Sequence, residues 1–159
     1  MKIFILEDDL VRIGLFIKNL GQHELTIAED LDYARKRWQP PYDIVLLDHD
    51  LGGQVYVSSD VENTGAGFVK DLLLGPLENL TGKFFVHSWN PDGGDLMHQL
   101  LINAGVDSTR EYFGPKLFAR LKSFIEGAKS GTSLGHLNPS SVRLSPLLLL
   151  FVVKRLRNS

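Results

Sequence analysis

The chain contains no cysteine among its 159 residues. This absence excludes disulfide bonds, thiolate catalysis and cysteine-based zinc sites, and it fits a reducing cytoplasm. Long apolar runs are also missing, because the longest, Leu147–Val153, is far shorter than the ~20 residues that a membrane-spanning helix needs. The first residues reach Glu7 too early for a secretory signal peptide. We therefore expect a cytoplasmic protein without a transmembrane span.

Neither sign of charge dominates, since 17 Lys and Arg stand against 19 Asp and Glu and the net charge is −2 at pH 7. A balance of this kind gives no global attraction to nucleic acid or to an anionic membrane, and we find no DNA-binding motif. The 43% hydrophobic and 23% charged residues are typical of a globular protein. The length fits one domain with a core of its own.

Short apolar runs alternate with longer segments of helical periodicity. We predict strands at 3–6, 24–28, 44–47, 83–86 and 110–113, and helices at 10–20, 31–38, 64–74, 96–104 and 115–128. Five strand-helix units in succession predict an α/β domain over residues 1–128, with a five-stranded parallel sheet and helices on both faces.

The last part of the chain departs from this alternation. Residues 129–145 are polar and read as a linker, and residues 146–159 are first apolar and then basic. This end can form a short helix that packs on the domain or on a partner, which would allow an oligomer. A shallow membrane contact and a disordered tail are the alternatives that remain open.

Polar clusters follow three of the predicted strands, namely Glu7-Asp8-Asp9, Asp48-His49-Asp50 and His87-Ser88-Trp89-Asn90. With the strand order 2-1-3-4-5, these three strand ends are neighbours at the carboxyl edge of the sheet. Ligands of open α/β sheets bind at this edge, near the topological switch point. We therefore expect the three clusters to share one pocket.

Oxygen-rich side chains of the first two clusters suit a divalent metal. Glu7, Asp8 and Asp48 supply the carboxylates that Mg²⁺ prefers. A charged Asp48 directly after four apolar residues is costly unless it has a partner. Glu7 and Asp8 have an alternative role near the start of the first helix. Ser88 is a candidate hydroxyl donor to phosphate, and Asn90 either binds phosphate or caps the helix that follows.

Histidines in the clusters are candidates for proton transfer near neutral pH. Alternation along an extended strand points Asp48 and Asp50 the same way and His49 the opposite way, so His87 is the stronger candidate. Trp89 is interpreted as a packing residue, with base stacking as the alternative.

Glu7-Asp8, Asp48 and Ser88 stand where response-regulator receiver domains carry their functional residues, and residues 1–128 resemble that family. The resemblance implies that the acidic pair and Asp48 hold magnesium, that Asp48 accepts a phosphoryl group and that Ser88 senses it. The Lys-Pro that usually follows strand 5 is replaced by Gly114-Pro115.

This departure and the added histidines resemble a divergent branch, the cyclic-phosphate processing receiver domains. The shared motifs are Leu47-Asp48-His49-Asp50-Leu51, His87-Ser88-x-Asn90-Pro91 and Thr64-Gly65-Ala66-Gly67. The branch implies a flavodoxin-like fold and a substrate with a cyclic phosphate, on a nucleotide or an RNA end.

The resemblance also implies a set of roles. Asp48, His87, His49 and Asp50 would be catalytic, Ser88 and Asn90 would bind phosphate, and Mg²⁺ or Mn²⁺ would sit on Glu7, Asp8 and Asp48. Whether the domain is a cyclic phosphodiesterase or phosphatase stays open at this point. A receiver phosphorylated on Asp48 and a non-catalytic phosphate-binding module are the alternatives.

Overall fold

The computed structural model describes residues 1–130 and 142–143. The strands are β1 (Lys2–Leu6), β2 (Glu24–Ala28), β3 (Ile44–Leu47), β4 (Lys83–Val86), β5 (Ser108–Arg110) and β6 (Val142–Arg143). The helices are α1 (Leu10–Leu20), α2 (Leu31–Arg37), α3 (Gly65–Leu74), α4 (Pro91–Asn103) and α5 (Pro115–Ser130), with a short 3₁₀ helix, η1, at Leu77–Asn79.

The strands form one parallel sheet in the order β5-β4-β3-β1-β2-β6. The predicted five-stranded order 2-1-3-4-5 is confirmed. The two residues of β6 lie in the segment predicted as a linker and extend the sheet beyond β2. The predicted helix or tail at 146–159 lies outside the described residues, and the division at 128 and 145 stays a prediction.

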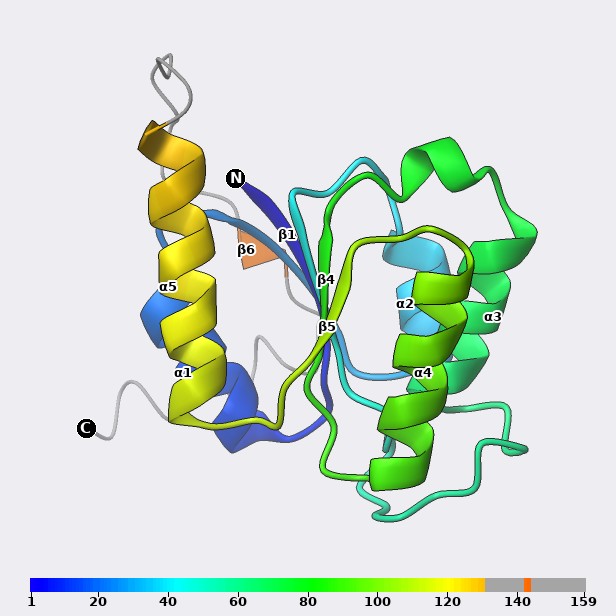
Figure 1. The fold of residues 1–159 in the computed structure, drawn as a ribbon. Helices are drawn as coiled ribbons and strands as arrows, with labels where there is room; N and C mark the ends of the chain where they lie inside the picture. Colours follow the sequence, from blue (N-terminus) through cyan, green and yellow to red (C-terminus); the bar gives the residue numbers. More distant parts are fainter. Residues whose placement is uncertain (131–141, 144–159) are drawn as a thin grey trace.

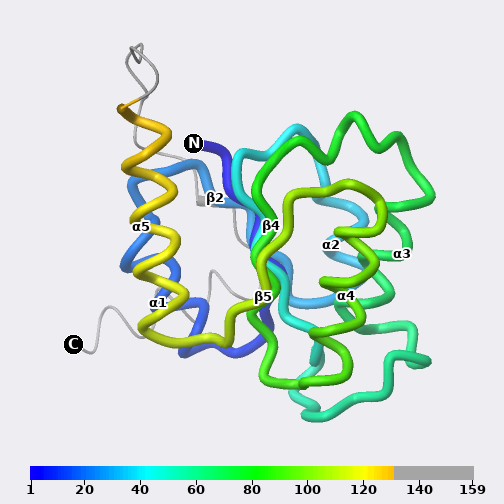
Figure 2. Tube along the Cα trace, in the orientation of Figure 1, coloured from blue at the N-terminus to red at the C-terminus, as the bar shows by residue number. Residues whose placement is uncertain are grey.

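Helices cover both faces of the sheet, as predicted. Figures 1 and 2 show α1 and α5 against one face and α2, α3 and α4 against the other. Each face has its own core, since alternate residues of a strand point to opposite sides. On β1, Phe4 packs among the residues under α2, α3 and α4, while Ile3 and Ile5 pack under α1 and α5. In the described part of the chain, no helix is both long and apolar enough to cross a membrane.

Two predicted boundaries near the strand ends are wrong. Helix α4 begins at Pro91 rather than Leu96, because the side chain of Asn90 caps it by accepting the N–H of Gly93 at 3.0 Å. Helix propensity alone does not predict this first turn, because Gly93 and Gly94 have a low helix propensity. Strand β5 runs from Ser108 to Arg110 rather than from Arg110 to Phe113, although the N–H of Phe113 still donates to the carbonyl of His87 at 3.0 Å.

The long segment between β3 and α3 begins and ends at one place. Asp50 and Thr64 form an isolated antiparallel bridge, and the N–H of Gly65 donates to the carbonyl of His49 at 2.9 Å. A side chain at Gly65 would collide with the carbonyl of Asp48. Glycine there lets the start of α3 lie directly against the end of β3, and the intervening residues form a closed loop, 51–63, along the lower edge in Figure 1.

Candidate functional site

A buried acidic pair lies at the carboxyl ends of β1 and β3. The side chains of Glu7 and Asp48 are almost fully buried, and one atom, Nη1 of Arg12, contacts both. This nitrogen lies 2.8 Å from Oδ2 of Asp48 and 3.5 Å from Oε2 of Glu7. The sequence pattern did not mark Arg12 as a site residue. Arg12 lies on the polar side of an amphipathic helix, which predicts a solvent-facing residue. The one feature that indicates a contact with the acids is its position one turn after the acidic cluster.

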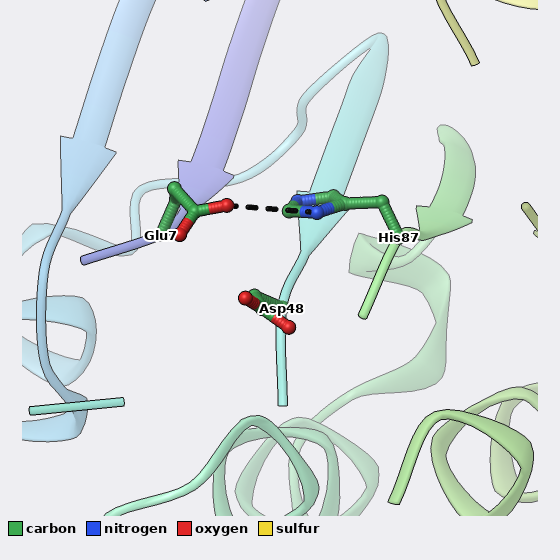
Figure 3. A group of neighbouring side chains, drawn as sticks. All are labelled: Glu7, Asp48 and His87. Atoms are coloured by element: carbon green, nitrogen blue, oxygen red, sulfur yellow. Dashed lines mark ion pairs between the residues drawn. The ribbon is translucent and has the colours of Figure 1, made fainter. Parts of the chain in front are cut away.

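A histidine completes this pair on the side of β4. Figure 3 shows Glu7, Asp48 and His87 converging from three strand ends, with Nδ1 of His87 at 3.7 Å from Oε2 of Glu7. Among the described residues, neither ring nitrogen of His87 nor Oε2 of Glu7 has a hydrogen-bond partner. The other carboxylate oxygen, Oε1, accepts the N–H groups of Asp8 and Asp9 at 3.1 and 3.0 Å. Oε2 of Glu7 and Nδ1 of His87 thus face each other, and neither has a hydrogen-bond partner within the described part of the chain.

Burial controls the ionisation of this group. Burial, together with the charge of Asp48, raises the pKa of Glu7 well above its usual value. Burial also raises the pKa of Asp48, although a hydrogen bond from Ser88 and the charge of Arg12 act in the opposite direction. Burial, followed by repulsion from Arg12 and Arg110, lowers the pKa of His87 to about 3. His87 is therefore a neutral imidazole at physiological pH, and its ring nitrogens are free to bind a metal.

The most compact group of potential metal ligands differs from the predicted set. Glu7, Asp48 and His87 offer ligand atoms that all lie within 4.8 Å of one another. Asp8 is not part of this group, because its Oδ2 accepts the N–H of Gly53. Burial nonetheless raises the pKa of Asp8, which lies beside Asp48 in the wall of a cleft.

This cleft has a volume of about 250 Å³. Its polar lining includes Asp8, Asp48, Asp50, Asn90 and Arg12, and its other residues are Asp9, Gly53, Gln54, Val55, Tyr56 and Trp89. The aromatic side chains at the rim, Trp89 and Tyr56, are 57% and 73% exposed. Trp89, interpreted as a packing residue, lies against Arg12 at the rim of the cleft rather than in the core, and base stacking remains the alternative.

Asp50 fixes the loop that forms one wall of the cleft. Its carboxylate accepts the backbone N–H groups of Tyr56 and Val57 at 2.7 and 3.0 Å and the side-chain amide of Asn90 at 2.9 Å. Burial would raise the pKa of Asp50, but these bonds and one from His49 outweigh burial and lower it. Asp50 thus remains a carboxylate and acts as the anchor of the loop.

His49 is separated from His87. Its ring is completely buried, with Nδ1 at 3.0 Å from Asp50 Oδ1 and Nε2 at 3.1 Å from Ser59 Oγ. It packs where any side chain on Gly93 would collide with it, and it does not line the cleft. Alternation along the strand predicted this orientation. His49 therefore supports the loop and the start of α4, and a direct catalytic role has no support from its position.

A second arginine that the sequence analysis missed holds the residues after β4. Arg110 donates to the carbonyls of Ser88 and Asn90 at 2.6 and 3.1 Å, over a Gly94 that leaves no room for a side chain. Ser88 is buried, and its Oγ accepts the N–H of Asn90 at 3.2 Å. These bonds set the position of Ser88 beside Asp48.

Comparison with known proteins agrees with this arrangement. The model of the cyclic-phosphate processing receiver domain matches residues 2–103, more than half of the chain. The chain belongs to this family. All of the candidate residues from Glu7 to Asn90 fall inside the match.

Solved structures of response regulators share the fold of this receiver domain. The Mn²⁺-bound form of response regulator Rcp1 has a TM-score of 0.55 at 15% identity, over 84% of this chain and 98% of that one. DrrB, an OmpR/PhoB homologue from Thermotoga maritima, has a TM-score of 0.51 at 17% identity, over 99% of this chain and 88% of that one. No curated protein matches the chain.

Proposed function

We propose that this receiver domain opens a cyclic phosphate carried by a nucleotide or an RNA end. The observation that carries the proposal is the neutral, unsatisfied His87 beside Glu7 and Asp48. Phosphorylation of a single aspartate does not need such a histidine, whereas hydrolysis needs groups that take up and return a proton. The exposed rings of Trp89 and Tyr56 at the rim offer a base a surface on which to stack.

Asp48 has the central role, because it both lines the cleft and contacts the buried group. In the proposed reaction a water oxygen bonds to phosphorus as the ring P–O bond breaks. Asp48, whose pKa is raised by burial, accepts the proton of that water, and Glu7 lies within 4.8 Å to share it. The leaving ribose oxygen takes up the proton that the Asp48 and Glu7 carboxyls hold, so the number of protons in the site is unchanged. Arg12 faces the phosphate charge from the cleft wall. The amide of Asn90 is used by Asp50 and Val57 and holds that wall in place.

A divalent metal fits the same residues. The two carboxylates and the neutral imidazole have three orphaned atoms between them, and such a mixed oxygen and nitrogen set suits Mn²⁺ better than Mg²⁺, which prefers oxygen alone. The likeness to Rcp1, whose structure holds Mn²⁺, supports this assignment. Glu7, Asp48 and His87 would hold the ion, with Asp8 beside it. When bound, the metal would polarise a phosphoryl oxygen.

An oligonucleotide that ends in a 2′,3′-cyclic phosphate tests the activity, with Mg²⁺ or Mn²⁺ supplied. We expect the wild type to open the ring and Asp48→Asn to be slower by about 10²-fold or more. His87→Ala should be more damaging than His49→Ala, which acts only through the loop. Lys18→Met, a change outside the cleft on α1, is the control. A wild type that leaves the ends intact with both metals would overturn the proposal.

A receiver phosphorylated on Asp48 is the second candidate, favoured by the likeness to two response regulators. Against it, Gly114 replaces the usual lysine, and Lys116 does not line the cleft. Acetyl phosphate should label Asp48 in a receiver and not in the hydrolase. A protein that neither takes this label nor opens cyclic ends would be a phosphate-binding module.

A further inference from the structure

Arg12 occupies the place between Glu7 and Asp48 that a metal would require. Its Nη1 lies 2.8 Å from Oδ2 of Asp48. A metal ion bound to the same oxygen would sit about 2.0–2.1 Å from it. A metal on this oxygen and the guanidinium would repel each other strongly in a buried site, so the two cations compete for it.

The side chain of Arg12 has a second contact to hold it when it leaves the acids. Its guanidinium carbon lies 4.9 Å from the ring centroid of Trp89 and 5.3 Å from that of Phe113. The face of an aromatic ring attracts a cation, so these two rings can hold the guanidinium. The side chain is 19% exposed, so its outer end reaches the cleft.

We propose that Arg12 is a built-in counter-ion that a divalent metal must displace from Asp48. This inference rests on the metal site of the proposed function and gives that site its regulation. Without a metal, the guanidinium balances one negative charge of the acidic pair. When the metal binds, the guanidinium moves away from Asp48 and stays in contact with the rings of Trp89 and Phe113. The exchange weakens the metal affinity, because only the fraction of molecules in which Asp48 is free can bind the metal.

Two measurements on the full chain test the exchange. In calorimetric titrations with MgCl₂ and MnCl₂, the dissociation constant of the metal should be lower for Arg12→Met than for the wild type by about tenfold or more. Lys18→Met removes a charge from the same helix outside the cleft and should leave the affinity unchanged. Tryptophan emission separates displacement from long-range repulsion. In Trp38→Phe, which leaves Trp89 as the sole tryptophan, MgCl₂ should change the emission, and the added Arg12→Met should abolish that change.

Different results would overturn the exchange at Arg12 and the proposed activity. Equal metal affinity in the wild type and Arg12→Met, no binding to either, or an unchanged emission of Trp89 on metal binding would overturn the exchange. If Arg12→Met does not fold, as judged by circular dichroism, Arg12→Lys replaces it, because the compact ammonium cannot stack as the planar guanidinium does and should lose the emission change. Failure to open cyclic ends, with the exchange observed, would overturn the proposed activity alone.

Discussion

Nδ1 of His87 lies 3.7 Å from Oε2 of Glu7, and neither atom has a hydrogen-bond partner among the described residues. A buried polar atom without a partner costs free energy, and native proteins keep few of them. Here the unsatisfied atoms surround a carboxylate that lines a cleft. The fold thus retains, at a cost in stability, groups that a substrate or a metal can satisfy.

The ionisation of His87 predicts a pH-dependent stability. Its pKa is about 3 in the folded protein, below the ordinary 6.5 of histidine. The unfolded chain binds a proton at His87 as the pH falls below 6.5, and the folded chain does not. Stability is therefore lost on acidification, by about 2 kcal/mol from this residue between pH 6.5 and 5.

Urea denaturation in EDTA at pH 7 and 5 checks this prediction on the wild type and His87→Phe. Both proteins keep Glu7, whose raised pKa acts in the opposite direction, so the difference between them isolates His87. The variant should lose less stability than the wild type. Equal losses would show that His87 does not titrate in this way.

Replacement of Gly93 by alanine should destabilise the protein. The added methyl group would enter the ring of His49, so we expect a loss of about 1–3 kcal/mol in the free energy of unfolding. Gly14→Ala is a matched control within a helix, because open space surrounds Gly14. There the higher helix propensity of alanine should add about 0.5–1 kcal/mol. Chemical denaturation measures both, and equal stability of the two variants would refute the packing argument.

Asn90→Asp should loosen the cleft wall and leave helix α4 capped. The carboxylate can still accept the N–H of Gly93, but it cannot donate to Asp50 or to the carbonyl of Val57, as the amide does at 2.9 and 3.0 Å. It also places two negative charges together. Faster hydrogen exchange across residues 52–63 is the expected result. Asp30→Ala, which removes the cap of α2, should lower stability without this local effect.

Asp48→Asn should abolish the binding of Mn²⁺, because it removes a charged ligand at nearly constant shape. Calorimetry on the metal-free protein measures the affinity. Asp60→Asn changes an exposed acid of the loop that lies outside the cleft lining, and it should bind metal as the wild type does. Undiminished binding by Asp48→Asn would exclude the proposed ligand set.

The convergence of Glu7, Asp48 and His87 could be predicted because topology alone determines it. Each follows a buried strand, and parallel neighbours end at the same edge of the sheet. No knowledge of side-chain conformation was needed. The parallel sheet and its two covered faces followed from the alternation of short and long apolar segments. The strand order 2-1-3-4-5 was a further assumption, and the observed pairing of the strands agrees with it.

The contributions of Arg12 and Arg110 could not be predicted in this way. Both side chains are long and reach across elements, from α1 to β3 and from β5 to the residues after β4. Sequence spacing locates the Cα atom of such a residue but not the far end of its side chain. The different places of the two histidines, His87 at the buried acidic pair and His49 at the loop, could be predicted only in part. Alternation along the strand gave the direction of the His49 side chain but not its hydrogen-bond partners.

The bridge between Asp50 and Thr64 gives the cleft two parts that can change independently. The acids and His87 belong to the sheet, whose packing tolerates little alteration. Tyr56 and Val55 belong to a loop whose two ends are already fastened together at its base. Insertions or exchanges within 51–63 would therefore reshape the surface that meets a ligand without moving Asp48. Substitutions in this loop can therefore change which ligand the cleft binds, while the acids and His87 at the strand ends stay the same.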